Sequence, residues 1–358
     1  MTEASRKIRI GVLFGGLSAE HDVSVLSATN VMKALSPERY DAVPIYITKT
    51  GTWLLSRYDN GKLEQPSEGA NLCLLPGGQG RLIAMGSDGT ATELPKLDIL
   101  FPVLHGLPGE DGAVQGFAET ARVPLAGCGI AGSANALDKD LAKRLLASAG
   151  IPTARAVTVL PGQVPAFEDL AKDLGRTVFL KPARQGSSVG VAKVKTPDDY
   201  QAALKDGFRH DTKLLAEEFI DGREFECAVL EDPDGGLFVS RCGEIVPAAS
   251  HGFYTYDAKY VDGDGAALIV PADLPRQLED GLRAMALKAF QALGCDGMAR
   301  VDFFLLSDGR FLVNELNTIP GFTDISMYSK VMAASGVAYA EIIDRLVDHG
   351  LARANRRS

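Results

Sequence analysis

The sequence contains few cysteines, and none of them forms a closely spaced pair. In a chain of 358 residues they stand at Cys73, Cys128, Cys227, Cys242 and Cys295, without any Cys-x-x-Cys arrangement. An odd number of scattered cysteines without a zinc-binding spacing argues against a disulfide framework and against a zinc centre. We therefore expect reduced thiols, most of which fill the core.

The sequence also has neither a long apolar run nor an excess of basic residues. No run of about 18 apolar residues occurs, and the apolar run 8–14 is too short and too soon interrupted for a signal peptide. The formal net charge is −9 and the pI is about 5.2. This charge argues against a nucleic acid or an anionic membrane as partner. Because the sequence shows no signal peptide or long apolar run and its cysteines are scattered, we expect a cytoplasmic protein.

What the sequence does contain is typical of a soluble globular protein, with 46% hydrophobic and 23% charged residues and no internal repeat. The length suffices for two or three domains. The β-branched run 8–14, the turn Gly15-Gly16 and helical periodicity over 23–35 predict a doubly wound α/β domain. The turn lacks the third glycine of the dinucleotide-binding fingerprint, which argues against an oxidoreductase.

Functional groups in such domains lie at the carboxyl ends of the strands, where Glu20 and His21 stand. The local sequence leaves two interpretations open: either Ser18 or Glu20 only caps the following helix, or Glu20 contacts a ligand. After a second strand at 42–47, the segment 56–92 is polar and glycine-rich, and we expect loops and short strands there.

The segment 298–317 predicts a β-hairpin, because Asp308-Gly309 is a favoured two-residue hairpin turn. Counting outward from this turn fixes the expected pairing of the two strands. The expected opposite pairs are Phe303 with Asn314, Asp302 with Glu315, and Arg300 with Asn317.

Strand residues alternate between two faces, so one face of this hairpin is polar. It carries Arg300, Asp302, Glu315 and Asn317, whereas the other carries Val301, Phe303, Leu305 and Leu312, with Asn314 as the exception. Carboxylates and an amide form an oxygen-rich site of the kind that Mg²⁺ accepts. The alternative is a solvated polar face with a cross-strand ion pair. Opposed carboxylates would repel each other without a cation, which favours the metal site.

Several loops have the composition of functional segments. The run 105–112 follows a buried strand and combines glycines with His105 and two acids. The segment 178–191 is a strand ending in Lys181 and a Gly/Ser loop, which suits it to covering phosphates; a plain flexible hairpin is the alternative. The aromatic and glycine-punctuated segment 251–265 is typical of a functional loop.

Other charged positions are ambiguous from their local sequence. Lys139 lies in a predicted helix over 133–149 and could be a solvated surface residue. A strand over 213–220 ends in acids, and a purine edge could bind at Glu217, Glu218 and the Ile220 backbone, with Glu224 on a ribose hydroxyl. The alternative is an edge strand with solvated acids.

The C-terminal region predicts helices and one anion-binding loop. We expect helices over 274–293, 327–334 and 339–348, followed by a basic, frayed tail. The loop 317–326 feeds the second of these helices, and amides at such a helix start favour an anion.

Taken together, these segments resemble one known family. The chain contains, in order, GGLSAEHDVS (15–24), HGLPGEDG (105–112), Asp138-Lys139, LKPARQGSSVG (180–190), EEFIDGREFE (217–226), YDAKY (256–260), ARVDFFL (299–305) and NELNTIPGFT (314–323). Each motif alone is weak, but together they resemble the ATP-grasp ligases, and among them the D-alanine–D-alanine ligases, over nearly the whole chain.

The resemblance implies a three-domain ATP-grasp architecture of the α/β class. Residues 1–128 would form an N-terminal domain with a doubly wound parallel sheet that binds the first substrate. Residues 129–222 would form the central subdomain with the Gly/Ser loop. Residues 223–358 would form the C-terminal subdomain with the lid loop 251–265 and the metal-binding hairpin.

The resemblance also implies ATP as co-substrate and two Mg²⁺ or Mn²⁺ ions. The metal ions would be held by Asp302, Glu315 and Asn317. Lys139, Lys181 and Ser187 would contact the phosphates, and Lys259 the transferred phosphate. The adenosine moiety would contact Glu217, Glu218, Ile220 and Glu224.

The implied reaction joins two D-alanine molecules through an acyl phosphate, for peptidoglycan synthesis by a homodimer. Its implied catalytic residues are Glu20, Ser187, Tyr260, Arg300 and Gly321. Its implied substrate-binding residues are Glu20, His105, Tyr260, Arg300, Gly321, Ser326 and Met327. A ligase that uses D-lactate as second substrate is the nearest alternative, and Tyr260 favours the dipeptide because relatives that make D-alanine–D-lactate often lack it.

Overall fold

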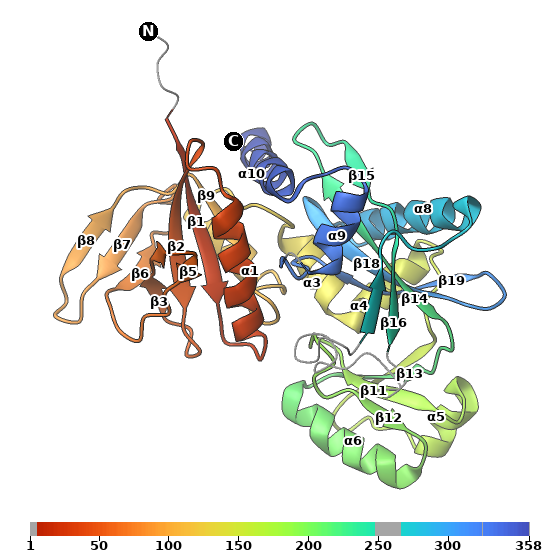
Figure 1. Ribbon diagram of the computed structural model, residues 1–358. Helices are drawn as coiled ribbons and strands as arrows, with labels where there is room; N and C mark the ends of the chain where they lie inside the picture. The colour runs from red at the N-terminus through yellow and green to blue at the C-terminus, as the bar shows by residue number, and fades with distance from the viewer. Residues whose placement is uncertain (1–5, 248–265, 324, 358) are drawn as a thin grey trace.

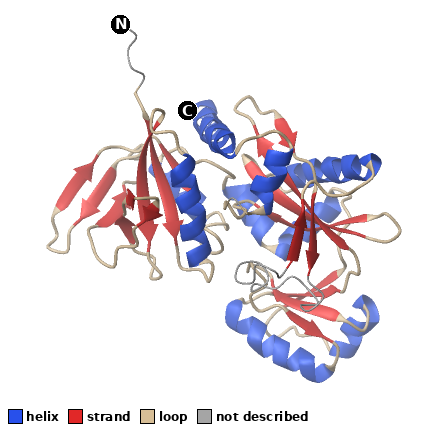
Figure 2. Ribbon diagram, viewed as in Figure 1, coloured by secondary structure: helices blue, strands red, loops and turns tan. Residues whose placement is uncertain are grey.

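The structure is a computed structural model that describes residues 6–247, 266–323 and 325–357 (Figure 1). In these residues the strands form three main sheets and one small ribbon, and helices cover the sheets (Figure 2). The fold is therefore mixed α/β. The described residues contain no helix long and apolar enough to cross a membrane.

The first sheet is built from the N-terminal segment in the order β8-β7-β6-β3-β2-β1-β9. Its parallel part comprises β2 (Tyr40–Ile47), β1 (Ile8–Gly15) and β9 (Ile99–Pro102). The antiparallel extension comprises β3 (Trp53–Leu55), β6 (Asn71–Leu74), β7 (Leu82–Met85) and β8 (Ala91–Leu94). The prediction of a parallel sheet is thus wrong for the extension. Three of its four connections, all within the described residues 6–247, are short and none contains a helix, which favours antiparallel pairing.

Helices cover both faces of this first sheet, as the doubly wound prediction requires. Val12 and Phe14 of β1 share a core cluster with α1 (His21–Ala34), whereas Leu13 packs in another cluster with α2 (Ala113–Ala121). The period-two alternation of β1 therefore supplies an apolar residue to each layer. The segment 56–92 also contains the ribbon β4 (Tyr58–Asp59) with β5 (Lys62–Leu63).

The second sheet is antiparallel, in the order β10-β13-β11-β12. Its strands are β10 (Ala156–Val159), β13 (Leu214–Glu218), β11 (Val178–Pro182) and β12 (Ala192–Val194). α5 (Phe167–Leu174) and α6 (Pro197–His210) share a core cluster with Val178 and Leu180 of β11. Phe179 and Lys181 lie on the opposite face of β11 and line the neighbouring cavity.

The third sheet has the order β17-β16-β14-β18-β19, with β15 on β14. Its strands are β14 (Arg223–Glu231), β15 (Leu237–Val239), β16 (Gly243–Pro247), β17 (Ala266–Ile269), β18 (Met298–Leu305) and β19 (Phe311–Asn317). The helix α8 (Arg276–Ala292) packs on the face formed by Phe225, Val301 and Phe303. The predicted helix over 274–293 is therefore confirmed.

The predicted single helix over 133–149 is wrong, because the chain breaks at Asp138. This residue has an extended backbone, and its side chain accepts a hydrogen bond from the Leu141 amide, which caps a new helix. The two helices are α3 (Ile130–Leu137) and α4 (Lys139–Ser148), and both contribute to the core of the third sheet. The break turns the Lys139 amide toward the Ala183 carbonyl, 2.9 Å away.

The C-terminal helices join the first and third sheets. α9 (Met327–Ala334) agrees with the prediction, but α10 (Tyr339–Arg357) continues through the expected frayed tail. Arg353 explains the difference, since its guanidinium donates to the Gly127 carbonyl at 3.0 Å and to Asp296 at 2.6 Å. Basic residues near a helix C-terminus also stabilise the helix, because they interact favourably with the negative end of its dipole.

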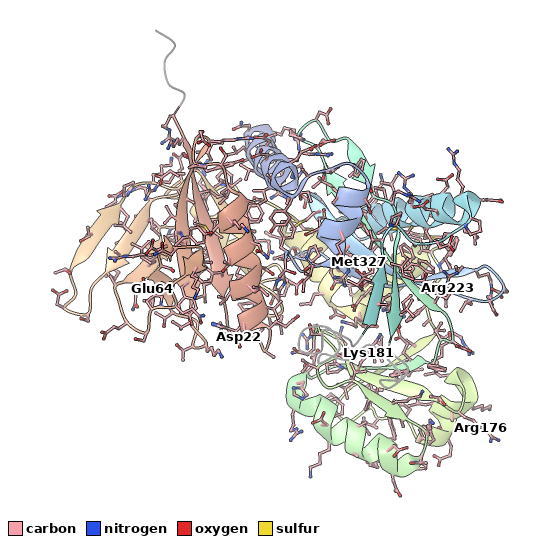
Figure 3. All side chains as sticks on the ribbon, viewed as in Figure 1. Asp22, Glu64, Arg176, Lys181, Arg223 and Met327 are labelled. Carbon is pink, nitrogen blue, oxygen red and sulfur yellow. The ribbon has the colours of Figure 1, made fainter. Side chains whose placement is uncertain are left out.

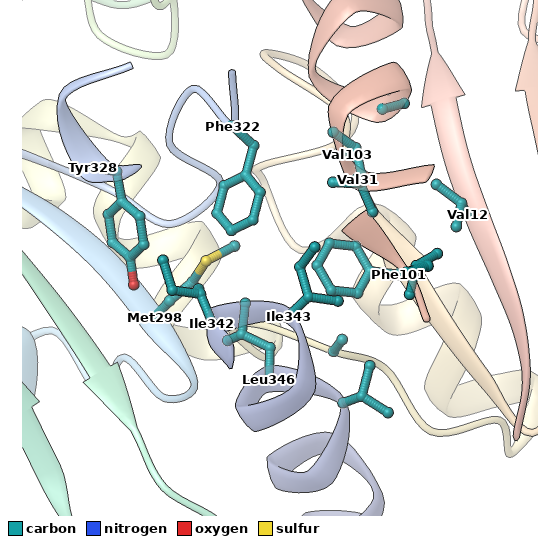
Figure 4. Close-up of a cluster of buried hydrophobic side chains, with 14 of the residues drawn as sticks. Val12, Val31, Phe101, Val103, Met298, Phe322, Tyr328, Ile342, Ile343 and Leu346 are labelled. Atoms are coloured by element: carbon teal, nitrogen blue, oxygen red, sulfur yellow. The ribbon is translucent and has the colours of Figure 1, made fainter. Parts of the chain in front are cut away.

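One hydrophobic cluster spans the junction between the N-terminal and C-terminal segments. Phe101 of β9 and the following Val103 lie on the N-terminal side of this cluster. Phe322 and Tyr328 lie on the C-terminal side, and Ile343 of α10 lies between the two sides (Figure 4). Interiors of this kind are closely packed and transmit displacements. The shared core therefore fixes the end of β1 relative to the hairpin β18–β19.

Candidate functional site

A cavity of about 430 Å³ lies between the second and third sheets. Figure 3 places Lys181 where the two sheets meet. The volume falls in the range of ordinary ligand sites. Nine of the predicted site residues line this cavity: Lys139, Lys181, Ser187, Glu217, Glu218, Ile220, Glu224, Asp302 and Glu315.

The hairpin β18–β19 has the predicted register at the site but not at its turn. Asp302 lies opposite Glu315 and Arg300 opposite Asn317, which confirms both pairs. Phe303, however, lies opposite Val313, and the register shifts between Asp302 and Phe303. The predicted pairing of Phe303 with Asn314 is therefore wrong.

Two deviations from the simple hairpin compensate each other. The Leu306 amide bonds to the Arg310 carbonyl and Gly309 has a φ of 83°, so the loop has one residue more than predicted. Asn314 is then the extra residue of a bulge in the other strand. Because of this bulge, Val313 packs in the core against α8 in place of the predicted Leu312, and Asn314 lines the cavity.

The polar face of the hairpin forms a compact, charged floor. The guanidinium of Arg300 donates to both carboxylate oxygens of Asp302, at 2.7 Å each, and the Asn317 amide donates to Asp302 at 3.1 Å. Burial disfavours the charged guanidinium, but the carboxylates of Asp302 and Glu226 outweigh it and raise the pKa of Arg300 well above its usual value. Arg300 therefore stays charged and offsets the repulsion between the two facing acids.

Lys139 extends this floor toward the second sheet. Its ammonium group lies 3.3 Å from Glu315 and donates to the Gln185 carbonyl at 2.8 Å. Only 11% of its side chain is exposed. A solvated surface position is therefore excluded, and Lys139 links the hairpin to the start of the Gly/Ser loop.

A second charged cluster lies on the central sheet, around the buried Glu217. Lys143 approaches one oxygen of this carboxylate at 2.5 Å, and Lys181 contacts the other. Burial opposes the charged carboxylate, but the two ammonium groups outweigh it and hold the pKa of Glu217 below its usual value. A solvated edge strand is therefore excluded for Glu217.

The neighbouring Glu218 has a different environment. Its carboxylate accepts hydrogen bonds from the backbone and side chain of Arg155, at 2.7 Å each. The aromatic rings of Phe179 and Phe219, 6.0 Å apart, lie beside it in the cavity wall. This wall offers an apolar surface to a planar ring, and the backbone after Glu218 offers polar groups at its edge.

Glu20 lies at the carboxyl end of β1 and does not cap the following helix. α1 has no side-chain cap bond, and the Ser18 hydroxyl accepts the Glu20 amide instead. The carboxylate of Glu20 accepts a hydrogen bond from Ser187 of the Gly/Ser loop. A Cβ at Gly186 would lie 3.0 Å from a Glu20 oxygen. The cap interpretation is thus excluded, and Glu20 and Ser187 meet across the domain junction.

His105 is buried, and both of its ring nitrogens have protein partners. Nδ1 lies 3.1 Å from the Ile319 carbonyl and must donate to it, so the neutral ring accepts the Ser27 hydroxyl at Nε2, also at 3.1 Å. Burial lowers the pKa of His105, which favours this neutral form. His105 therefore ties the N-terminal unit to the loop after β19.

The same loop 105–112 contributes a second buried group, Glu110. Its carboxyl accepts the Gly106 amide at 2.7 Å and also a bond from the Ile319 amide. Burial, followed by the nearby charge of Glu20, raises the pKa of Glu110 to about 8. Together His105 and Glu110 hold both sides of the Ile319 residue.

The remaining predicted residues lie around the loop after β19 or outside the described residues. Gly321 is close to Ser326, because a Cβ there would lie 2.9 Å from the Ser326 hydroxyl. That hydroxyl bonds to Thr323 at 2.7 Å. The side chain of Met327 is buried in the shared hydrophobic cluster, at the place labelled in Figure 3. Lys259, Tyr260 and the lid 251–265 lie outside the described residues.

The oxygen donors of the hairpin fit Mg²⁺ in combination with phosphates. In the part of the chain that the structure describes, no group of three or more His, Cys, Asp and Glu residues forms a closed metal site. Asp302 and Glu315 supply two carboxylates, and Asn317 an amide. Mg²⁺ is usually bound by one or two carboxylates together with substrate phosphates, so this donor set fits a nucleotide-bridged ion.

Four residues of this site were not assigned a role from the sequence. Lys143 gave no local signal, and Glu110 stood out only as one of two acids in the loop 105–112, since pairing with Glu217 and Ile319 arises only in the folded chain. Asn314 appeared on the wrong face because the bulge was not foreseen. Glu226 gave a usable signal, since it stands two residues after Glu224 in a strand and must project from the same face.

Comparison with known families matches most of the chain. Residues 9–128 match the family model described as D-ala D-ala ligase N-terminus, and residues 145–348 match the one described as D-ala D-ala ligase C-terminus. The chain is 67% identical over 352 residues to D-alanine–D-alanine ligase A of Brucella suis biovar 1 (strain 1330), covering 98% of this chain and all of that protein.

Solved structures are similar over nearly the full length. The D-alanine–D-alanine ligase of Coxiella burnetii superposes with a TM-score of 0.84 at 32% identity, covering 99% of this chain and 96% of that one. The VanG D-Ala:D-Ser ligase of Enterococcus faecalis superposes with a TM-score of 0.81 at 33% identity, covering 96% of this chain and 99% of that one.

Proposed function

The chain belongs to the D-alanine–D-alanine ligase family of ATP-grasp enzymes, and we propose that it joins two D-alanine molecules to D-alanyl-D-alanine at the site described above. ATP is converted to ADP and phosphate, and the product serves peptidoglycan synthesis. The observation that carries this proposal is the juxtaposition of Lys139, Lys181 and the hairpin acids Asp302 and Glu315 at one cavity.

We assign the three sheets to the three units of the ATP-grasp architecture. The first unit is 1–128, the central unit 129–222 and the C-terminal unit 223–358. The position of the cavity between the second and third sheets supports ATP binding between the last two units. Glu20 reaches this junction from the first unit, which supports binding of the first amino acid there.

The cavity wall offers the groups that ATP needs. The adenine ring packs beside Phe179 and Phe219, its edge meets Glu217, Glu218 and the Ile220 backbone, and Glu224 holds the ribose. Lys139, Lys181 and Ser187 neutralise and contact the phosphates, with Lys259 on the phosphate that is transferred. Lysines act here as point charges.

Asp302, Glu315 and Asn317 would hold two Mg²⁺ or Mn²⁺ ions, which when bound neutralise the charge on the transferred phosphate. The fit of the donor set supports this assignment. Arg300, on the same hairpin face, faces the reacting carboxylate. Phosphoryl transfer needs positioning and charge neutralisation rather than covalent help from the protein.

The first D-alanine binds through its ammonium group to Glu20, which Ser187 and Tyr260 orient. Its carboxylate attacks the γ-phosphate of ATP, releases ADP and becomes an acyl phosphate. The amine of the second D-alanine, held through its carboxylate by Ser326 beside Met327, then attacks the acyl carbon. Arg300 and the Gly321 amide stabilise the resulting oxyanion, after which phosphate leaves.

The acyl phosphate must be protected from water until the second amine attacks. The loop 184–190 carries Ser187, whose bond to Glu20 crosses the junction and supports a covering role. The lid 251–265 completes the cover. His105 acts on substrate through the loop that contains Gly321, because its ring nitrogens bond to Ile319 and Ser27.

The decisive experiment is an incubation of the purified protein with ATP, Mg²⁺ and D-alanine, followed by mass analysis and a phosphate assay. We expect one dipeptide per phosphate. Absence of dipeptide near neutral pH from folded protein contradicts the proposal. The similarity to a D-Ala:D-Ser ligase makes the second substrate a separate question, which adding D-serine and D-lactate to the mixture answers.

The family also suggests a homodimer and a cytoplasmic location, where ATP is available. Light scattering coupled to size-exclusion chromatography measures the first, and cell fractionation the second. A monomer at assay concentration contradicts the dimer assignment without affecting the chemistry.

A further inference from the structure

Three carboxylates form a row across neighbouring strands of the third sheet. Glu226 of β14 lies opposite Asp302 of β18, which in turn lies opposite Glu315 of β19. Residues that are directly opposite in a sheet project from the same face. Glu226 therefore belongs to the polar floor of the cavity.

Glu226 and Asp302 share one cation. The Nε of Arg300 lies 2.9 Å from a Glu226 oxygen and 2.7 Å from an Asp302 oxygen, while Nη2 contacts the other Asp302 oxygen. Both acids are buried, with 6% and 9% of their surface exposed. Charge pairs shielded from water in this way are coupled strongly, so a change at one acid is felt by the other.

The strand pairing explains why Arg300 can reach Glu226. The residue directly opposite Arg300 on β14 is Ala228, and the next position on the same face of β14 is Glu226. Ala228 carries only a methyl group, whereas the long side chain of Arg300 extends to the Glu226 carboxylate.

The proposed function places two demands on Asp302. In the structure both of its oxygens accept hydrogen bonds from Arg300, yet a metal ligand must also direct an oxygen to the ion. Any rotation of the carboxylate toward the metal weakens the pair with Arg300. A second carboxylate is then needed to keep the guanidinium aimed at the reacting carboxylate.

We propose that Glu226 is the positioning residue that holds Arg300 in place while Asp302 turns an oxygen to the metal ion. This inference rests on the proposed function. Without the charge of Glu226, Arg300 would pair more tightly with Asp302 and compete with the metal. Loss of Glu226 therefore weakens metal binding first, and turnover as a consequence.

The test is Glu226→Gln, which keeps the size of the side chain but removes its charge. ADP-loaded protein is titrated with Mn²⁺, and free Mn²⁺ is followed by electron paramagnetic resonance. We expect the Kd for Mn²⁺ to rise about 10- to 100-fold, as for other outer-shell partners of metal ligands. The affinity for ADP measured without metal should stay unchanged, and kcat should fall at limiting Mg²⁺.

A matched control is Glu279→Gln. Glu279 is a buried glutamate with a guanidinium partner, Arg241, outside the cavity, and its loss should leave the Kd for Mn²⁺ unchanged. Equal Mn²⁺ affinity in Glu226→Gln and wild type would overturn the inference. A wild-type protein that forms no dipeptide would instead refute the proposed function, so the two failures are distinguishable.

Discussion

Two buried glutamates of this protein differ in protonation near neutral pH, since Glu217 is ionised and Glu110 keeps its proton. Glu217 lies between the ammonium groups of Lys143 and Lys181, which outweigh its burial and lower its pKa. Glu110 receives backbone amides from Gly106 and Ile319, with the carboxylate of Glu20 nearby, and burial raises its pKa to about 8. Burial opposes charge at both residues, so the neighbouring formal charges decide the outcome.

The two parts of the site differ in the same way as these two glutamates. The cavity between the second and third sheets is organised by full charges, on Lys139, Lys181, Arg300, Asp302 and Glu315. The junction with the N-terminal unit is organised mainly by hydrogen bonds of neutral groups around His105 and Ile319. Substitutions that remove charge should therefore affect the first region more strongly than the second.

The largest effect is expected at the floor of the charged region. Asp302→Asn removes a proposed metal ligand and one partner of Arg300, and we expect kcat to fall by at least about 100-fold. Glu315→Gln should behave alike. Steady-state kinetics measure the loss, and circular dichroism should show an unchanged fold. Near-normal turnover in either variant would make the metal assignment wrong.

The next effect is on the stability of the folded protein and concerns the charged cluster around Glu217. Glu217→Gln leaves Lys143 and Lys181 without their shared counter-ion, at positions where only 11% and 12% of the side chains are exposed. Breaking a buried ion pair from one side costs about 3–5 kcal/mol. Urea denaturation measures this loss.

The double variant Glu217→Gln/Lys143→Met sharpens the same test. It removes one of the two unpaired charges and should recover part of the lost stability, in a double-mutant cycle. If Glu217→Gln is as stable as wild type, the charges at this site do not hold the carboxylate as described.

A smaller effect is expected where the two regions meet. Glu20→Gln weakens the proposed contact with the substrate ammonium, and the loss of a charge-assisted hydrogen bond is worth about 1.5–3 kcal/mol. We expect a rise of about 10- to 100-fold in the KM for D-alanine at the first site. The KM for ATP serves as internal control and should change little; unchanged D-alanine kinetics would argue against this role of Glu20.

A further effect is a pH dependence of stability at the neutral junction. Between the usual pKa of a glutamate, 4.5, and about 8, the native Glu110 keeps a proton that the unfolded chain has lost. The native state therefore binds more protons, and its stability falls as the pH rises through this window. Glu110→Gln should lose this part of the slope. Denaturation of both proteins across the window measures the difference, and parallel curves would contradict the raised pKa.

Much of the fold followed from local patterns in the sequence. The alternation in β18 and β19 predicted that Asp302 and Glu315 face the cavity, and the periodicity over 274–293 predicted α8. The break at Asp138 was not predicted, because periodicity continues across it and only the capping bond to Leu141 marks the new start. The extension of α10 to Arg357 depends on tertiary contacts of Arg353, which the local composition does not reveal.

The register of the hairpin shows how a site can be predicted correctly from incomplete geometry. The turn has one residue more than the Asp-Gly rule suggests, and the bulge at Asn314 restores the count beyond it. Both pairs at the site were therefore right, while the pairs between bulge and turn were wrong. Contacts between distant segments, such as Lys143 with Glu217 and Glu110 with Ile319, were beyond local patterns.

The most direct test of the account is the product formed from a mixture of D-alanine, L-alanine and D-lactate with ATP and Mg²⁺. Mass spectrometry with isotopically labelled substrates distinguishes the three. The account predicts D-alanyl-D-alanine as the main product, with one phosphate released for each dipeptide. Formation of the D-alanine–D-lactate ester in its place, incorporation of L-alanine, or ATP hydrolysis without ligation would contradict it.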